Sequence, residues 1–412
     1  MRRTPLFLLA CLTVGASAAV ANSIFSFHPN GIGVWAWPGD ARSFGMGGAS
    51  SAVYDMSNPV GVNPATLTAF EMTSLSASVF LQARSVRDVA GLTGTFNEQY
   101  PRDLRIVTPL GRGFVSGFAL EPLSDVRITW ATRATAGGLP VLDSLEASGG
   151  LWAASIEVAR RFGSVSAGAR WQLARGSIHT EWRRTILDGS PLATSTLQTR
   201  TYSGSIFGLG GLYRYGDAWT VGAALDIPAS LRETQAVSLG TRVPNEFYPT
   251  HADGPTVAPD HDTTTIASAK LPLGLTAGVA WTSGRRATVA LDVAYRRWSR
   301  LSPEFPNIWG VALGTEVRPS VNYTSFPVLQ WLYRAGVRWE QHYIPSPDTA
   351  PSAWFVTAGM GIPIGAGAGQ IDYAFEYGQR GTLDRQAARE RIWRQTISVV
   401  GWERWFERRP RR

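Results

Sequence analysis

Apolar and polar side chains alternate along most of the chain after about residue 72. From Val165 to Leu173 the odd positions are apolar, and the even positions carry Ser, Gly, Arg and Gln. The same two-residue period recurs over 287–296 and 370–377. A strand places such charges on one face, whereas a helix would scatter them around its circumference. The pattern therefore predicts a long series of two-faced β-strands.

Glycine turns and longer polar stretches separate these strands in alternation. Tight turns are predicted at Gly111-Arg112-Gly113, Gly163, Gly216-Asp217, Gly284-Arg285 and Gly365 to Gly367. Longer polar loops are predicted at 87–100, 133–149, 185–199, 233–265, 342–352 and 380–390. Short turns on one side and long loops on the other are typical of outer-membrane barrels, and the hairpins predict about fourteen strands. Such a sheet has to close, because every backbone polar group in lipid must be paired.

A soluble β-sandwich with one wet face would show the same alternation. The apolar faces end in aromatics such as Trp152, Trp298 and Trp339, which suit a lipid interface. The chain holds 16 Trp, 12 Tyr and 17 Phe, yet its mean hydropathy is only −0.06. No segment after the N-terminal leader is apolar enough for a membrane helix. We therefore expect an all-β fold, a transmembrane antiparallel barrel.

The two ends of the chain differ from the barrel. Residues 1–21 are predicted to be a signal peptide, with Arg2 and Arg3 before an apolar core and a cleavage site at Ala19-Val20-Ala21. Cleavage there removes Cys11, the only cysteine, which excludes a disulfide framework and a thiolate metal site. Residues 71–406 are expected to form the barrel, and 407–412 a basic tail.

Residues 22–70 are predicted to be a hatch inside the barrel lumen. The part from Asp40 to Phe70 is rich in Gly, Ala and Ser and contains the motif Asn63-Pro64-Ala65. Pro64 fixes its own φ and biases Asn63 away from helix, while the Asn side chain can bond to nearby backbone. Small residues and turns ahead of a barrel are the composition expected of a plug.

Charge and chemistry narrow the function classes. The formal net charge is +8, and every cation except Lys270 is Arg. No basic stripe points to nucleic acid, whereas basic groups at the rim fit anionic lipid headgroups. Five scattered histidines and no paired nucleophile argue against an enzyme, and no cofactor is expected. A cluster in the 233–265 loop is the one candidate for a divalent cation, although its spacing matches no established site: His251, Asp253, Asp260, His261 and Asp262.

Four stretches resemble one family. GDARSFGMGGASSAVYDMSNPVGVNPATLTAF, LDVAYRRWSRL, YRAGVRWEQHYIPSP and the pair AGMGIPIG…IDYAFEYG are similar to segments of the long-chain fatty acid transporter (FadL/TodX-like) family. The first also resembles the hatch of a PorV-like sister group, which works in protein secretion. Thr66 departs from the pattern, because many relatives have Gly there. The resemblance implies a fourteen-stranded barrel with a hatch, apolar substrates, and lateral exit through the wall.

These observations predict an outer-membrane channel of a diderm bacterium for passive uptake of hydrophobic small molecules such as long-chain fatty acids. A binding partner in secretion or surface assembly is the first alternative, and a lipid hydrolase is the weaker one. The barrel is expected to be monomeric, with outer-membrane lipids and a hydrophobic ligand as partners. The candidate substrate-binding residues are hatch aromatics, a methionine and three arginines: Phe25, Phe27, Trp35, Trp37, Phe44, Met46, Arg42, Arg334 and Arg338.

Overall fold

The computed structural model describes residues 23, 25–89, 91, 93–187, 193–242, 260–284, 286–322, 325–345 and 349–403. Its strands are β1 (Val34–Trp35), β2 (Thr73–Asp88), β3 (Thr93–Gly111), β4 (Phe114–Ala136), β5 (Leu139–Phe162), β6 (Val165–Ile186), β7 (Ala193–Tyr215), β8 (Trp219–Pro228), β9 (Ser230–Arg242), β10 (Asp260–Lys270), β11 (Leu273–Ser283), β12 (Ala287–Arg297), β13 (Ile308–Val317), β14 (Leu332–Gln341), β15 (Ser352–Ile364), β16 (Gly369–Arg380) and β17 (Ala388–Glu403). The helical elements are α1 (Ala41–Gly45), η1 (Pro64–Ala69), η2 (Trp298–Arg300), α2 (Pro327–Gln330), η3 (Gly365–Gly367) and α3 (Leu383–Gln386).

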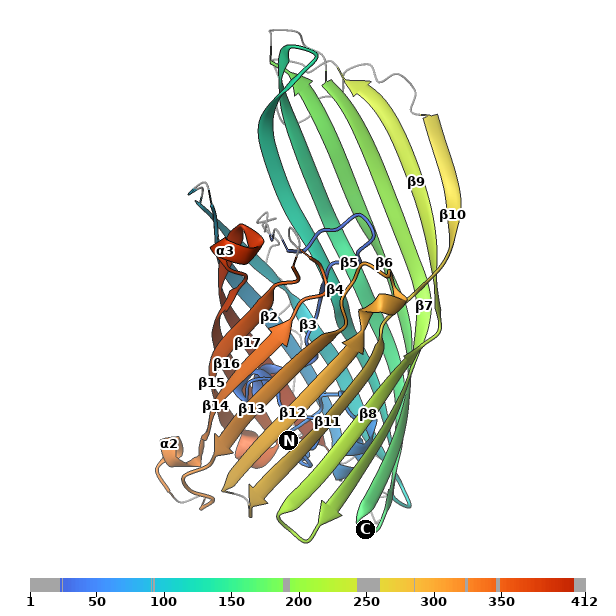
Figure 1. The fold of residues 1–412 in the computed structure, drawn as a ribbon. Helices are drawn as coiled ribbons and strands as arrows, with labels where there is room; N and C mark the ends of the chain where they lie inside the picture. Colours follow the sequence, from blue (N-terminus) through green and yellow to red (C-terminus); the bar gives the residue numbers. More distant parts are fainter. Residues whose placement is uncertain are drawn as a thin grey trace, which may run out of the picture.

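Strands β2 to β17 close into one antiparallel barrel (Figure 1). The last strand, β17, pairs with the first, β2, from Ala388↔Asp88 to Glu403↔Thr73. β8 and β9 both pair with β7 and together form one interrupted barrel strand. β10 and β11 form the next interrupted strand in the same way. The breaks fall beside Pro228 and Pro272, which have no amide hydrogen for the ladder. When β8 with β9 and β10 with β11 are each counted as one strand, the described part of the chain forms a fourteen-stranded barrel, as the hairpin count predicts.

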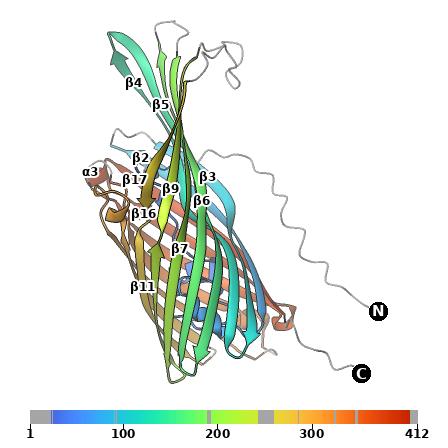
Figure 2. The ribbon, with the colours of Figure 1, turned by 90° about the vertical axis from the view of Figure 1, so that its right-hand side faces the viewer.

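One side of the barrel is much taller than the other (Figures 1 and 2). β4 and β5 run to a two-residue turn at Gly137-Gly138, and their pairing extends to Ala136↔Leu139. The predicted loop 133–149 is thus wrong, as are those parts of 87–100, 185–199 and 233–265 that lie in strands. In these segments polar residues occur on both faces of the strands. The alternation of apolar and polar positions is therefore lost, and the sequence pattern predicts loops there. We call the raised parts of β4–β7, β9 and β10 the sheet extension.

The outer face of the barrel carries an apolar band. On β12, Val289, Leu291 and Val293 are exposed, while the alternate side chains are buried on the lumen side. Aromatic pairs lie near the loop end of this band: Tyr295 with Trp309 (ring centroids 4.8 Å apart), Trp354 with Tyr377 (6.0 Å), and Tyr377 with Trp393 (5.7 Å). Large apolar side chains facing outward, with aromatics at the border, are the surface expected in contact with lipid.

Residues 25–72, here called the lumen segment, lie inside the barrel (Figures 1 and 2). α1 packs against β14–β17, and η1 packs against β4–β7 on the other side of the lumen. Asp40 caps α1 by accepting a hydrogen bond from the Ser43 amide at 2.9 Å. The predicted hatch, residues 22–70, falls largely within this segment.

Glycines let the lumen segment touch the wall backbone. A Cβ added at Gly314 on β13 would lie 2.1 Å from the Met46 carbonyl oxygen, and one at Gly336 on β14 would lie 2.3 Å from the Gly47 amide nitrogen. Only a residue without a side chain fits at such approaches. Gly314 and Gly336 therefore mark the positions at which the backbone of the lumen segment contacts the wall.

Among the described residues, no helix combines the length and apolar character needed to cross a membrane. The predicted signal peptide, 1–21, and the basic tail, 407–412, lie outside the described residues.

Candidate functional site

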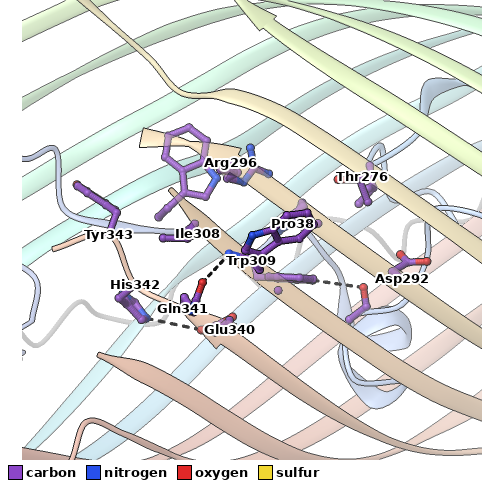
Figure 3. Close-up of a pocket in the computed structure, with 16 residues that line it drawn as sticks. Pro38, Thr276, Asp292, Arg296, Ile308, Trp309, Glu340, Gln341, His342 and Tyr343 are labelled. Carbon is purple, nitrogen blue, oxygen red and sulfur yellow. Dashed lines mark hydrogen bonds and ion pairs between the residues drawn. The ribbon is translucent and has the colours of Figure 1, made fainter. Parts of the chain in front are cut away.

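The main cavity lies between the lumen segment and the wall strands β11–β14 (Figure 3). Trp35, Trp37 and Pro38 line it from the lumen segment, and Ile308 and Trp309 line it from β13. The cavity and the solvent at its mouth together occupy about 640 Å³. An apolar cavity with a few polar groups is the usual form of a small-molecule site.

A second cavity of about 560 Å³ adjoins the first on the side of β4, β6 and β8. Both cavities are bordered by the same five residues: Trp35, Pro38, Val62, Thr276 and Arg296. Glu121, Arg170 and Asp226 make the second cavity more polar than the first. The shared residues form a junction between an apolar chamber and a polar one.

Arg296, at this junction, has a more distant carboxylate partner than Arg42, Arg334 and Arg338 have. Its Nη1 lies 3.9 Å from Asp226 Oδ2, whereas Arg170 Nη2 lies 2.6 Å from Asp226 Oδ1. One carboxylate thus faces two guanidinium groups. The Arg296 guanidinium also lies 5.2 Å from the centroid of the Trp35 ring, within cation–π range. The junction therefore places a guanidinium group with one distant carboxylate partner beside an apolar chamber.

Aromatic rings close the cavity toward the loop end. The Trp298 and Tyr343 rings stack with centroids 3.5 Å apart, and Phe305 and Trp35 meet this pair edge-on. The Tyr343 hydroxyl donates to the Gly33 carbonyl at 2.7 Å and accepts from the Ile32 amide at 3.0 Å. These contacts tie the lumen segment to the loop after β14.

His342 lies in the same loop and lines the main cavity. Burial and, to a smaller extent, the nearby Arg380 lower the pKa of His342 to about 4, against the opposing effect of Glu340. Its Nε2 is 3.7 Å from Glu340 Oε1. His342 is therefore neutral in the folded protein at pH 7.

The three arginines predicted to hold a substrate anion all have carboxylate partners. Arg42 binds Glu316 at 2.8 Å, and Arg334 binds Glu316 and Asp372, each at 2.6 Å. Arg338 contacts Glu376 at 2.7 Å and Glu340 at 3.2 Å. Arg42 therefore fastens α1 to the wall, and its ion pairs raise its pKa above the usual range despite burial. None of the three lines either cavity.

Of the predicted aromatics, Trp35 and Trp37 line the main cavity. Phe25 packs beneath Gly381, and Phe27 meets Trp182 edge-on. The Phe44 ring lies 5.2 Å from the Arg102 guanidinium, and Met46 packs against β13. Arg296, Trp298 and Tyr343 were not among the binding residues predicted from the sequence. The motif LDVAYRRWSRL contains two of them, and it was the available signal.

Asn63 anchors the predicted hatch motif. Its Nδ2 donates to the carbonyls of Ser51 (3.0 Å) and Gly211 (2.9 Å), and its Oδ1 accepts from the Ala65 amide at 3.0 Å. Pro64 occupies the first position of η1. Asn63 thus joins two parts of the lumen segment to β7.

The wall is interrupted between β3 and β4. Their pairing extends only to Leu104↔Leu120, and beyond it β4 pairs with β1 through Val34↔Asp125. Arg102, the bulged residue of β3, donates to the Trp37 carbonyl. The lumen segment therefore stands where a neighbouring strand would otherwise complete the wall.

No group of acidic, His and Cys side chains suited to a metal ion occurs in the described part of the chain. His251 and Asp253 of the candidate cluster lie outside the described residues, and Asp260, His261 and Asp262 begin β10.

The model of the BamG family matches residues 1–410. No curated protein matches the chain significantly. Among solved structures, the fold is similar to the toluene transporter TodX of P. putida, with a TM-score of 0.61 and 16% identity over 90% of this chain and 99% of that one. It is also similar to the toluene transporter TbuX of Ralstonia pickettii (0.60, 16%, 89% and 98%) and to a Pseudomonas aeruginosa FadL homologue (0.59, 13%, 89% and 98%).

Proposed function

The chain belongs to the BamG family, and we propose that it is an outer-membrane channel through which hydrophobic small molecules diffuse without an energy source. The observation that carries the proposal is the apolar cavity between the lumen segment and β11–β14. The likeness in fold to TodX and TbuX, described as toluene transporters, agrees with it. No catalytic step is part of the proposal.

The finer substrate class in this proposal is long-chain fatty acids. Their apolar chains fit the chamber lined by Trp35 and Trp37, and their carboxylates fit the junction at Arg296. A charge-assisted hydrogen bond to a guanidinium is stronger than a neutral one, particularly away from bulk water. Arg296 replaces the three arginines suggested by the sequence because their charges are already matched.

The lumen segment acts in this account as a hatch across the barrel axis. A substrate leaves the cavities sideways, through the wall where β3 and β4 do not pair. The two cavities support this route, because the second is lined by Glu121, Pro122 and Leu123 of β4. Movement of Trp35 and its neighbours on β1 opens the passage.

Binding measurements with two ligands distinguish the channel proposal from the finer proposal that Arg296 recognises a fatty-acid carboxylate. We expect the purified barrel to bind oleate saturably, and more tightly than oleyl alcohol. Arg296→Gln should weaken oleate binding about tenfold and leave alcohol binding unchanged. Arg297→Gln is the matched control, because its exposed side chain follows on the same strand.

If neither ligand binds, the channel proposal fails. If the alcohol binds and oleate is indifferent to Arg296→Gln, only the carboxylate anchor fails.

A second candidate function, a binding partner in secretion or surface assembly, is supported by the sheet extension. It stands beyond the barrel (Figure 1) and exposes charged pairs such as Arg184–Asp143 at 2.6 Å. Replacing residues 130–145 with a two-residue turn would shorten β4 and β5 in register, because Trp130 pairs with Leu145. Loss of a co-purifying surface protein, with oleate binding intact, would support this function; unchanged co-purification would contradict it.

A further inference from the structure

A cation stands on the lipid-facing surface near the turn end of the barrel. On β5 the side chains of Glu157 and Ala159 are buried on the lumen side, so Ile156, Val158, Arg160 and Phe162 face outward. Ile156 and Phe162 are 59% and 54% exposed. Arg160 therefore lies within a row of apolar side chains, three positions before the Gly163 turn.

Two phenyl rings flank the Arg160 guanidinium. Its Cζ lies 4.5 Å from the Phe114 ring centroid and 4.9 Å from that of Phe162. Phe114 is directly opposite Arg160 in the β4–β5 ladder. Cation–π contacts hold the guanidinium against the outer surface, but they supply no anion and accept no hydrogen bonds in the guanidinium plane.

The surroundings of Arg160 contain more cations and no paired anion. Arg112, at the tip of the β3–β4 turn, and Arg161 are also exposed. Within the described residues, no carboxylate oxygen lies within 4.0 Å of any of these three arginines. Exposed Arg183 and Arg184 of the sheet extension, by contrast, each have an acidic partner at 2.6 Å.

A charge at the edge of the hydrocarbon layer is costly unless it reaches an opposite charge. Arg side chains meet this need by extending toward the headgroup layer, where phosphate oxygens accept bidentate hydrogen bonds. The turn end of such a barrel faces the periplasm, so the adjacent leaflet is the inner one.

We propose that Arg160, flanked by Phe114 and Phe162 and supported by Arg112 at the adjacent turn, binds the phosphate of an anionic phospholipid in the periplasmic leaflet. The lipid's acyl chains lie along the apolar row formed by Ile156, Val158 and their neighbours. The site is separate from the lumen cavities, because it is on the opposite face of β5.

Native mass spectrometry of the barrel with added phosphatidylglycerol tests this site. We expect Arg160→Gln to lower retention of the lipid about tenfold, as for one lost charge-assisted pair. Arg160→Lys should retain part of the binding. Arg183→Gln, an equal charge change in the sheet extension, should leave it unchanged, and diacylglycerol with the same chains should not distinguish Arg160→Gln from the wild type.

Equal retention of phosphatidylglycerol by the wild type and Arg160→Gln would overturn the proposal. So would an equal loss in Arg183→Gln. If Arg160→Gln does not fold, the wild type decides: stronger retention of phosphatidylglycerol than of diacylglycerol supports the site, and equal retention overturns it.

Discussion

At the level of single residues, the charged side chains of the lumen differ in how many close partners of opposite charge or hydrogen-bond donors they have. Asp292 accepts hydrogen bonds from the Ser50 and Ser51 amides, both at 2.8 Å, and from the Ser51 hydroxyl at 2.7 Å. Arg334 has two carboxylates within 2.6 Å. Arg296, by contrast, shares the Asp226 carboxylate with Arg170, which lies closer to it. The groups with close partners hold the lumen segment in place, and in the proposed function Arg296 binds the carboxylate of the ligand.

Asn63→Ala should loosen the lumen segment. It removes the cap of η1 and the hydrogen bonds to Ser51 and Gly211, so we expect the free energy of unfolding to fall by about 2–4 kcal/mol. Urea unfolding in lipid vesicles measures this. Asn97→Ala, at an exposed position of β3, is the control and should change little. Equal stability of the two variants would contradict the anchoring role.

His342 should make the fold sensitive to acid. Its folded pKa of about 4 lies below the ordinary 6.5, so between these values the unfolded chain binds more protons. The free energy of unfolding should therefore be fully present above pH 6.5 and fall by about 3 kcal/mol as the pH drops to 4. His342→Gln should flatten that part of the pH profile. An unchanged slope in the variant would show that other groups cause the loss.

At the scale of elements, the two-residue period predicted the strands wherever one face meets lipid and the other meets the lumen. It failed in the sheet extension, because both faces there are exposed: Thr129, Trp130, Ala131 and Arg133 of β4 are all exposed, whichever face they are on. The site was harder to predict. The weak pairing of Arg296 depends on Asp226 and Arg170, which lie on separate strands and meet only when β6, β8 and β12 assemble into one sheet.

The packing of the lumen segment on the wall can be tested at a glycine. Gly314→Ala would place a methyl group 2.1 Å from the Met46 carbonyl oxygen, so the lumen segment or β13 must move. We expect a loss of about 1–3 kcal/mol in the free energy of unfolding. Gly211→Ala on β7 is a matched control, since nothing lies within 4 Å of its added Cβ. A similar effect of both substitutions would contradict close packing at β13.

At the scale of the whole molecule, three features combine: a closed barrel, a segment folded inside it, and cavities between the two (Figures 1 and 3). The lumen segment contacts strands around the barrel, from β4–β7 at η1 to β14–β17 at α1. In the proposed function this segment obstructs the axial path and directs a molecule in the cavities toward the wall.

Deletion of residues 22–66 should convert the barrel into an open pore. The charged lumen strands would then face water, so unrelated polar solutes and ions should pass. Single-channel conductance in planar bilayers should rise well above that of the intact protein, with heat-modifiable mobility on gels as the control for folding. Unchanged conductance of a folded variant would mean that the segment is no plug.

Uptake of labelled oleate by liposomes that carry the protein measures whether a hydrophobic molecule passes through the main cavity. We expect saturable uptake by the wild type and strong inhibition by Ala294→Trp, which would fill the cavity from β12. Uptake no faster than in protein-free liposomes, or equal uptake by the wild type and Ala294→Trp, would show that the main cavity is not a route of passage.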